Sequence, residues 1–176
     1  MGAVVPSSRF LARAIVDAAG IRDGERVVEL GAGSGVFTRE IVRRFPRCTL
    51  VVVEMSVSLG RELAREFPNA KVVVASVESL PQWGTALGGV KYDRVVSGLP
   101  WALWTESHQR LVMDLLIPYL ASGARFVTFH YWHSRLLGRV QATRRVLKER
   151  FVRVGHSRTV WANLPPAYVH IAEEPK

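Results

Sequence analysis

Cysteine and long apolar runs are both scarce in this sequence. Cys48 is the one cysteine among 176 residues, so neither an internal disulfide nor a cysteine-based zinc site is available, which points to a reducing, cytoplasmic compartment. The longest apolar runs fall far below the roughly 18 residues that span a membrane. Low-complexity segments and internal repeats are also missing, while 48% of the residues are hydrophobic, as in globular proteins. Disorder and membrane-spanning helices are therefore excluded.

The N-terminal segment lacks the features of an export signal. Pro6, Arg9 and Arg13 interrupt the region where a secretory signal needs an uninterrupted apolar block. The length of 176 residues fits one domain, and no linker-like stretch divides it. We therefore expect a single domain over residues 1–176 and a cytoplasmic location.

Acidic residues are outnumbered, because Lys and Arg total 24 against 15 Asp and Glu, a formal net charge of +9. Such a surface attracts polyanions, either nucleic acid or an anionic bilayer. Lysine is also rare, since 20 of the 24 basic residues are arginine. Arginine suits bidentate contacts to phosphate, although codon bias or heat adaptation gives the same count. Composition does not choose between these partners.

Strand-like and helix-like segments alternate along the chain. Short β-branched runs predict strands at Arg26–Leu30, Thr49–Val53, Lys71–Ala75, Arg94–Ser97, Ala124–Phe129, Phe151–Val160 and Ala167–Ala172. Amphipathic stretches predict helices at Arg9–Ala19, Val36–Phe45, Val57–Phe67, Thr105–Leu120 and His133–Glu149. This alternation predicts an α/β fold with a mostly parallel, seven-stranded sheet and helices on both faces. The last two strands have no helix between them and are expected to pair as an antiparallel hairpin at one edge.

The sharpest local motif is VVELGAGSG, from Val27 to Gly35. A strand runs into a glycine-rich turn and then into a helix, an arrangement that brings bare backbone close to a ligand. Val36 stands where a dinucleotide fingerprint requires glycine, so NAD is disfavoured. Glu29, just before the turn, would repel phosphates and instead suits a ligand with an ammonium or sulfonium group. The turn residues expected to hold that ligand are Gly31, Ala32, Gly33 and Gly35.

Residues at the ends of the next strands predict an adenosyl ligand. Glu54 follows the second strand, where a carboxylate can accept both hydroxyls of a ribose. Met55 is placed to cover a face of the adenine. Ser76 and Val77, after the third strand, are expected to meet the adenine edge, and Ser97 ends the fourth strand beside the same ligand.

The fourth strand leads into YDRVVSGLPW, from Tyr92 to Trp101. Together with the glycine-rich turn and Glu54, this segment resembles the class I S-adenosylmethionine-dependent methyltransferases, which implies a Rossmann-like fold and S-adenosylmethionine as the cofactor. The motifs SGLP, GAVVPSS near the start and RTVWANLPPAYV near the end resemble those of the bacterial phospholipid N-methyltransferases, which convert phosphatidylethanolamine to phosphatidylcholine. The resemblance extends from Gly2 to about Val169.

The resemblance also has departures. Family members usually carry an amphipathic helix ahead of GAVVPSS, whereas this sequence begins at that segment. We therefore expect only weak, salt-sensitive contact with the inner face of the membrane, through arginines such as Arg135, Arg139 and Arg150. Ser76 stands where an acidic residue is common. The segment VTFHYWH, from Val127 to His133, is similar to the family's strand-end QFTY stretch but has Thr128 and His130 in it.

Aromatic residues gather in the segments that should meet at the reacting end of the sheet. An electron-rich wall would stabilise an amine that becomes cationic on methylation, although packing in the core explains any single aromatic equally well. Tyr131 and Asn163 are the candidate catalytic residues, which would orient the amine nitrogen. The candidate substrate-binding residues are Gly98, Leu99, Pro100, Trp101, Trp132 and Tyr168. His130 and His133 have helical spacing, but no third ligand is evident and no metal is expected.

The predicted last helix is strongly basic. Leu136, Leu137, Val140 and Leu147 are expected to form one apolar face, with Arg135, Arg139, Arg145, Lys148 and Arg150 beside it. Either a solvated helix packed on the sheet or a contact to anionic lipid explains this pattern.

Three functions other than lipid methylation also fit the sequence. The rRNA or DNA adenine methyltransferases have a strand-end segment of similar shape and need a basic surface, but this chain has no appended nucleic-acid domain, which makes nucleic acid the less favoured partner. A small-molecule N-methyltransferase and a cofactor-binding protein without catalysis are the others. The favoured hypothesis is methyl transfer to a phospholipid amine, with the oligomeric state left open.

Overall fold

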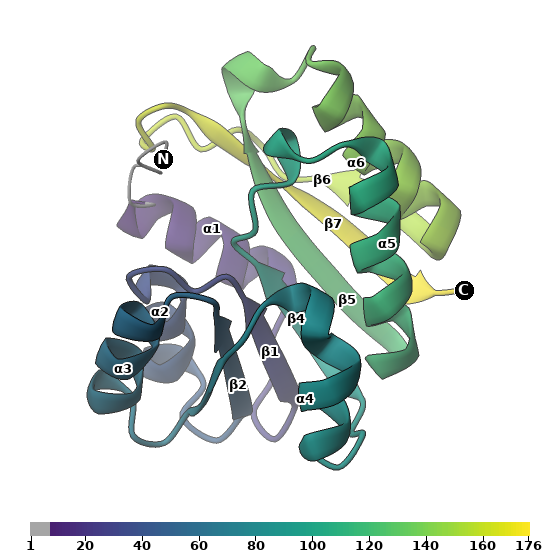
Figure 1. Ribbon diagram of the computed structural model, residues 1–176. Coiled ribbons are helices and arrows are strands. Elements are labelled where there is room, and N and C mark those ends of the chain that lie inside the picture. The colour runs from purple at the N-terminus through teal and green to yellow at the C-terminus, as the bar shows by residue number, and fades with distance from the viewer. Residues whose placement is uncertain (1–7) are drawn as a thin grey trace.

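The computed structural model describes residues 8–176, and a seven-stranded sheet forms its centre (Figure 1). The strands are β1 Arg26–Leu30, β2 Thr49–Glu54, β3 Lys71–Val74, β4 Tyr92–Ser97, β5 Leu120–Tyr131, β6 Phe151–His156 and β7 Ala167–Pro175. The helices are α1 Arg9–Ala19, α2 Val36–Arg44, α3 Val57–Glu66, α4 Leu80–Ala86, α5 Glu106–Leu116 and α6 Gly138–Arg150. Short 3₁₀ turns follow β3, β4, α5 and β5.

The strand order is β3-β2-β1-β4-β5-β7-β6. Neighbours from β3 to β5 are parallel, whereas β7 lies between β5 and β6 and is antiparallel to both. The predicted α/β class, with its mostly parallel sheet, is confirmed. The predicted C-terminal hairpin is also confirmed: β6 and β7 pair antiparallel at one edge of the sheet, with β6 outermost and β7 beside β5.

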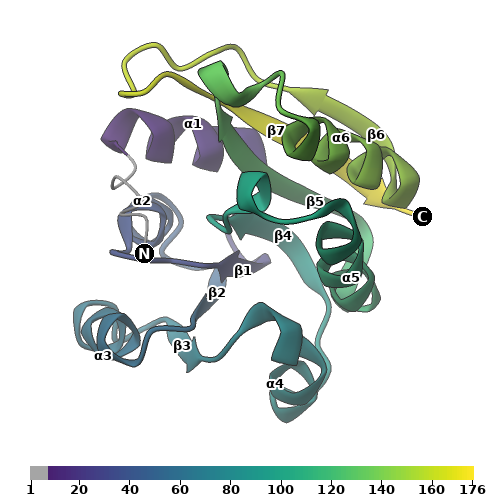
Figure 2. The ribbon, with the colours of Figure 1, turned by 45° about the horizontal axis from the view of Figure 1, so that its top comes forward.

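Two apolar cores lie on opposite faces of the sheet, as the strand alternation requires. Val27 and Val96 face a core shared with α1, α2 and α3. Val28 and Val95 face a second core shared with α4, α5 and α6. Figure 2 shows these two helical layers on either side of the strands. The carboxyl ends of β1, β2 and β4 are left free for a ligand.

Helix α1 begins and ends as its sequence predicts. The Ser8 hydroxyl caps it by accepting a hydrogen bond from the Leu11 N–H, and Gly20 ends it in the left-handed region at φ +59°. Residues 2–7, which include most of the GAVVPSS motif, lie outside the described residues.

Several predicted boundaries differ from the observed ones. The helix expected to reach Leu120 ends at Leu116, because Pro118 cannot continue it and lies within a 3₁₀ turn, Ile117–Tyr119, before β5. The strand expected at Ala124–Phe129 is the middle of the longer β5. Strand β6 ends at His156, and Val160 forms only an isolated bridge with Ala167. Helix α4 was not predicted, because its seven residues carry little amphipathic pattern.

The predicted helix at His133–Glu149 begins later than expected. A 3₁₀ turn occupies Trp132–Ser134, and α6 starts only at Gly138. The predicted apolar face is therefore wrong in part: Val140 and Leu147 are buried, whereas Leu136 and Leu137 precede the helix and are 81% and 55% exposed. Within residues 8–176, no helix combines the length and the apolar character needed to cross a membrane.

Candidate active site

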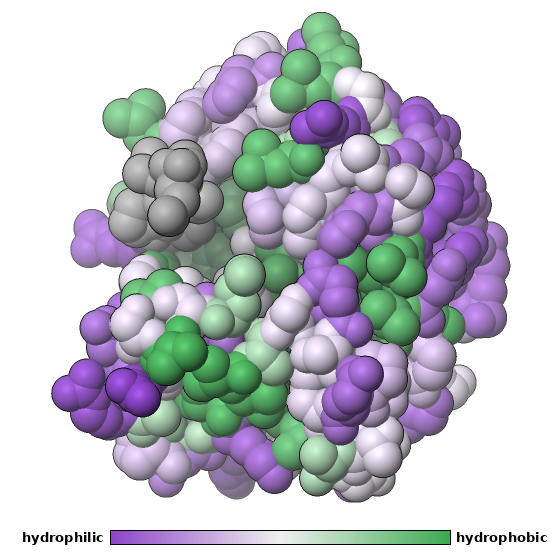
Figure 3. Space-filling view, in the orientation of Figure 1, coloured by the Kyte–Doolittle hydropathy of each residue, from purple (hydrophilic) through white to green (hydrophobic). Residues whose placement is uncertain are grey.

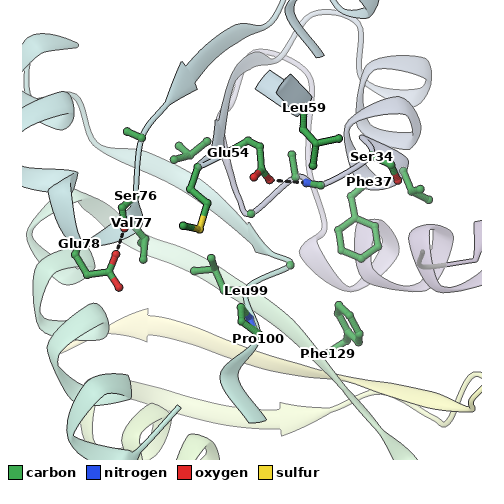
Figure 4. Close-up of a pocket in the computed structure, with 18 of the residues that line it drawn as sticks. Ser34, Phe37, Glu54, Leu59, Ser76, Val77, Glu78, Leu99, Pro100 and Phe129 are labelled. Carbon is green, nitrogen blue, oxygen red and sulfur yellow. Dashed lines mark hydrogen bonds between the residues drawn. The ribbon is translucent and has the colours of Figure 1, made fainter. Parts of the chain in front are cut away.

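A cavity of about 650 Å³ lies at the carboxyl ends of β1, β2, β3 and β4 (Figure 4). Its walls come from the glycine-rich turn after β1, the ends of β2 and β3, the segment after β4, and the side chain of Phe129 in β5. The predicted site residues that line it are Gly31, Ala32, Gly33, Glu54, Met55, Ser76, Val77, Gly98, Leu99 and Pro100. The four strand ends thus bring together most of the predicted cofactor residues.

The glycine-rich turn presents backbone to this cavity. Gly33 has a φ of +56°, and a Cβ built on it would meet no atom within 4 Å, so its α-carbon faces open space. Gly98, after β4, packs tightly, since its Cβ would lie 2.5 Å from the Gly31 carbonyl oxygen. Only glycine allows the segments after β1 and β4 to approach this closely.

Glu54 is held in place before any ligand arrives. Its Oε2 accepts a 2.8 Å hydrogen bond from the Gly33 N–H, drawn in Figure 4, and its Oε1 accepts a 2.9 Å bond from the Ser56 N–H. The side chain is largely buried but lines the cavity. Each carboxylate oxygen can accept a further hydrogen bond, so Glu54 can receive two hydroxyl donors from a ligand.

Glu29 lies behind the turn and does not line the cavity. Its Oε2 accepts a 2.7 Å bond from the Thr38 hydroxyl, whereas its buried Oε1 has no partner among residues 8–176. Burial raises the pKa of Glu29 to about 7, against the opposing effect of the Thr38 hydrogen bond, and the nearby Glu54 adds to the rise. The prediction that Glu29 faces the ligand is therefore not matched by its position.

The far end of the cavity has the residues expected near an adenine. Met55 is 75% exposed and lies over the cavity. The Ser76 hydroxyl donates to the carboxylate of Glu78, which also lines the cavity and lies 3.1 Å from His108 Nε2. A carboxylate is thus present here, two residues after Ser76, which stands where the resembled family commonly has an acidic residue.

The end of the cavity beside Leu99 and Pro100 is apolar and aromatic. Phe37 and Phe129 meet edge to face with ring centroids 5.9 Å apart, and Trp104 also lines this region. Trp104 belongs to the aromatic residues that the sequence places at this edge, whereas the lining residues not predicted from the sequence are Ser34, Val36, Phe37, Val53, Leu59, Ala75, Glu78 and Phe129. Phe129 could have been found, because it lies two residues before Tyr131 on the same strand and therefore on the same face.

Three predicted site residues pack beside the cavity instead of lining it. Gly35 lies against α3, where its Cβ would come within 2.7 Å of Leu63. The Ser97 hydroxyl is buried and accepts a 2.9 Å bond from the indole N–H of Trp101. Trp101 is 1% exposed and belongs to the core under α5. The segment after β4 turns inward at Trp101, which removes this ring from the proposed substrate side.

The two predicted catalytic residues also lie off the cavity. Tyr131 is half-buried, with its ring 5.7 Å from Phe129 and stacked at 5.8 Å on His133, and burial raises the pKa of its phenol. Asn163 is buried, and both ends of its amide are engaged: Oδ1 accepts from the Ser8 hydroxyl at 2.6 Å, and Nδ2 donates to the Pro165 carbonyl. Asn163 thus joins its loop to the start of α1.

Trp132 and Tyr168 lie in a second cavity, on the α6 side of the sheet. His130 is buried on that face, near His170, whereas His133 stacks on Tyr131. The two histidines of the considered metal pair are therefore separated. Among residues 8–176, no group of three or more His, Cys, Asp or Glu side chains could hold a metal ion.

Comparisons with known proteins point to methyl transfer. The sequence model of the ribosomal RNA adenine dimethylase family matches residues 7–84. An ornithine lipid N-methyltransferase of Singulisphaera acidiphila is 33% identical over 130 residues, which cover 72% of this chain and 68% of that protein. A ribosomal RNA small subunit methyltransferase A of Laribacter hongkongensis is 34% identical over 96 residues, covering 54% of this chain and only 36% of that protein.

Solved structures share the fold at low sequence identity. A precorrin-6y C5,15-methyltransferase from Geobacter metallireducens superposes with a TM-score of 0.72 at 15% identity, over 98% of this chain and 91% of that one. This likeness concerns the arrangement of the sheet and its helices.

Proposed function

Because the chain belongs to the class I S-adenosylmethionine-dependent methyltransferases, we propose that it methylates the amino group of a membrane lipid, with the ethanolamine head group of phosphatidylethanolamine as the first candidate. The cofactor is S-adenosylmethionine. A lipid substrate would require contact with a membrane surface, so we include peripheral attachment in the proposal.

The large cavity fits this cofactor. Gly33 leaves open space beside its backbone, and the preset carboxylate of Glu54 can accept the ribose hydroxyls. Met55, Ser76, Val77 and Glu78 would surround the adenine at the far end. When bound, the cofactor supplies an electrophilic methyl group on a sulfonium.

The aromatic end of the cavity is suited to an amine. Phe37, Trp104 and Phe129 would remove water from an incoming ammonium, which lowers its pKa and favours loss of a proton. A ring face also attracts the cation that forms on methylation, by roughly 0.5 to 2 kcal/mol per ring. Leu99 and Pro100 would hold the amine in line with the methyl group, and alignment alone supplies much of the acceleration in such a displacement. Tyr131 supports this wall by packing against Phe129.

The observation that carries the proposal is the extent of the lipid-enzyme match. It covers 130 residues, 72% of this chain and 68% of that protein, which is longer than the stretch from Gly31 to Pro100 that carries the proposed cofactor residues. The alternative function, rRNA adenine methylation, is supported by a family match to residues 7–84, which end before β4 and before Trp104 and Phe129 of the aromatic wall. That portion holds the glycine-rich turn and Glu54, which any substrate class would share.

A methyl-transfer assay with separate substrates tests the proposal. The full chain would be incubated with isotopically labelled S-adenosylmethionine and, in separate reactions, with phosphatidylethanolamine vesicles, ornithine lipid vesicles, an rRNA fragment and small amines. Mass spectrometry would identify the labelled product. We expect label in a lipid; label confined to RNA or to a small amine would overturn the lipid assignment.

Phe129→Leu tests the aromatic wall itself. Leucine keeps an apolar side chain but removes the ring, so we expect about a ten-fold loss of kcat, as about 1.4 kcal/mol requires. Phe10→Leu, at an exposed position of α1, is the matched control and should keep full turnover. Equal rates for the parent and both variants would remove Phe129 from the reacting end.

A further inference from the structure

A second cavity, of about 370 Å³, lies on the α6 face of the sheet. Its lining comes from the turn after β5, the first residues of α6, the end of β6 with the loop that follows, and the start of β7. It shares no lining residue with the large cavity. Nothing in the proposed methyl transfer uses it.

The walls of this cavity are cationic. Arg135, Arg144 and Arg158 line it, and none of its described lining residues is acidic. Across residues 8–176, no carboxylate forms an ion pair with any of these three arginines. On the same helix, by contrast, Arg145 pairs with Glu106 and Arg150 pairs with Asp114. The unpaired guanidinium groups repel one another, and an anion would relieve that repulsion.

A buried histidine adds an unsatisfied polar atom to the same wall. His170 is 4% exposed and lines the cavity, and its Nε2 has no hydrogen-bond partner among the described residues. Burial lowers its pKa to about 4, with further lowering by His156 and Arg144, so the ring is neutral at pH 7. The rings of His130 and Tyr168 pack against it at 5.0 and 5.1 Å. A neutral imidazole can still donate one hydrogen bond to a bound oxygen.

We propose that this cavity binds the phosphate group of an anionic phospholipid that neighbours the substrate in the bilayer. A phosphate offers several oxygens in a tetrahedral arrangement, and the residues that line this cavity include three arginines and two hydroxyl-bearing residues, Thr159 and Tyr168. A planar carboxylate has only two oxygens and would accept hydrogen bonds from fewer of these residues. The bound lipid is assigned as a neighbour of the substrate because the ethanolamine arm is short and the two cavities have no wall in common.

The apolar rim of the cavity favours a lipid as the source of the phosphate. Trp132 and Leu136 line the cavity and are exposed, and Trp161 lies 5.9 Å from the Trp132 ring. Arg135 lies 4.2 Å over that ring. Figure 3 shows hydrophobic side chains beside hydrophilic ones at the top of the molecule, over the segment between β5 and α6. Such a mixture suits the boundary between head groups and acyl chains. The choice of a bilayer lipid, unlike the anion site itself, rests on the proposed function.

Vesicle binding tests the proposal without any need for activity. Sedimentation would compare the full chain on phosphatidylcholine vesicles with and without phosphatidylglycerol at low salt. We expect Arg144→Gln and Arg158→Gln each to weaken binding to the anionic vesicles about five-fold, since a basic residue near such a surface contributes about 1 kcal/mol. Arg22→Gln is the control, because it removes the same charge from an exposed position outside the cavity, in the loop that leads into the amino end of the central strand β1, and it should change binding less than two-fold.

The results separate this site from its rivals. If Arg22→Gln weakened vesicle binding as much as the two cavity variants, the effect would come from overall charge, and the proposed phosphate site would be overturned. Calorimetry with sn-glycerol 3-phosphate tests whether the phosphate comes from a soluble molecule. The lipid assignment would be overturned if this compound bound as tightly as the vesicles and if Arg158→Gln weakened its binding to the same extent. The lipid assignment would also be overturned if an rRNA fragment competed with the vesicles for the protein and if Arg144→Gln and Arg158→Gln weakened that competition.

Methylation kinetics separate this inference from the proposed function. If the chain methylates phosphatidylethanolamine, Arg158→Gln should raise the apparent KM for anionic vesicles about five-fold and leave kcat unchanged. An unchanged KM would contradict the phosphate site, while the methylated lipid would still support the proposed function. If no lipid is methylated, the proposed function fails, and the vesicle-binding comparison still decides the phosphate site.

Discussion

At the scale of single residues, Glu29 carries an energetic cost that its sequence position does not reveal. Its carboxyl is completely buried, one oxygen has no partner among residues 8–176, and the pKa is raised to about 7. The folded chain therefore keeps a proton that the unfolded chain loses near pH 4.5. Stability must fall as the pH rises from about 4.5 to 7, and the cost persists above that window.

Glu29→Gln tests this cost. The amide can still accept the Thr38 hydrogen bond but has no proton to lose. The free energy of unfolding of the variant should therefore rise by about 3 kcal/mol relative to that of the parent as the pH goes from 4.5 to 8. Urea unfolding at both pH values measures the difference. Glu62→Gln, at an exposed position of α3, controls for the lost charge. The same parent-to-variant difference at both pH values would contradict the prediction.

Gly33→Val tests the cofactor end of the large cavity. Valine would fill the open space beside Gly33 and strain a backbone held at φ +56°, so S-adenosylmethionine binding should weaken at least about 100-fold, equivalent to about 2.7 kcal/mol. Calorimetry of the folded variant measures this. Gly24→Val is the matched control, since Gly24 also has a positive φ and open space around it but lies outside the cavity. Both variants should lose stability, and only Gly33→Val should lose the ligand.

At the scale of elements, the loop before β7 and the N-terminus of α1 depend on each other. The Ser8 hydroxyl accepts from the Leu11 N–H and donates to the buried Oδ1 of Asn163. One side chain thus caps a helix and satisfies an amide that is 155 residues away in the chain. This linkage gives Asn163 a structural role in place of the predicted catalytic one.

Ser8→Ala should therefore cost more than the loss of an ordinary cap. We expect the free energy of unfolding to fall by about 2 kcal/mol, because the variant loses the helix cap and the buried Asn163 oxygen loses a hydrogen bond. Thr105→Ala removes the comparable cap of α5, where Thr105 accepts from the His108 N–H at an exposed position, and should cost about 1 kcal/mol. Chemical denaturation of both variants provides the comparison. Equal losses would mean that the contact with Asn163 adds nothing.

Helices α5 and α6 give several arginines partners within the chain, so these arginines need no ligand. Glu106 accepts from both Arg110 and Arg145, which lowers its pKa to about 2, and Arg110 also pairs with Glu149. Of the three arginines expected to meet a membrane, Arg150 pairs with Asp114 and Arg139 donates to the Leu103 carbonyl. Arg135 is the member of that set that faces the second cavity.

At the scale of the whole molecule, the net charge of +9 should make membrane contact sensitive to salt. Screening shortens the reach of a charge from about 10 Å at 0.1 M to about 3 Å at 1 M ionic strength. We expect affinity for vesicles containing phosphatidylglycerol to fall more than about ten-fold over this range, as measured by sedimentation. Pure phosphatidylcholine vesicles are the control. Tight binding to them at high salt would instead indicate an apolar anchor.

The sequence alone was enough to predict the class of fold and the cofactor end of the site. The turn from Gly31 to Gly35, the carboxylate of Glu54 and the residues after β4 are local features, each set by a few neighbouring positions at the end of a strand. Parallel strands place their carboxyl ends at one edge, so these features had to meet whatever the details of packing. Alternating apolar positions likewise determined that helices would cover both faces.

Only the tertiary structure decided which residues line each of the two cavities. Neighbouring side chains on a strand point to opposite faces, so His130 lies under α6 while Phe129 reaches the large cavity. The insertion of β7 between β5 and β6 carries Tyr168 and His170 to the second cavity, and the inward turn after Pro100 buries Trp101. These outcomes depend on contacts between segments far apart in the chain, whose free energies no local pattern records.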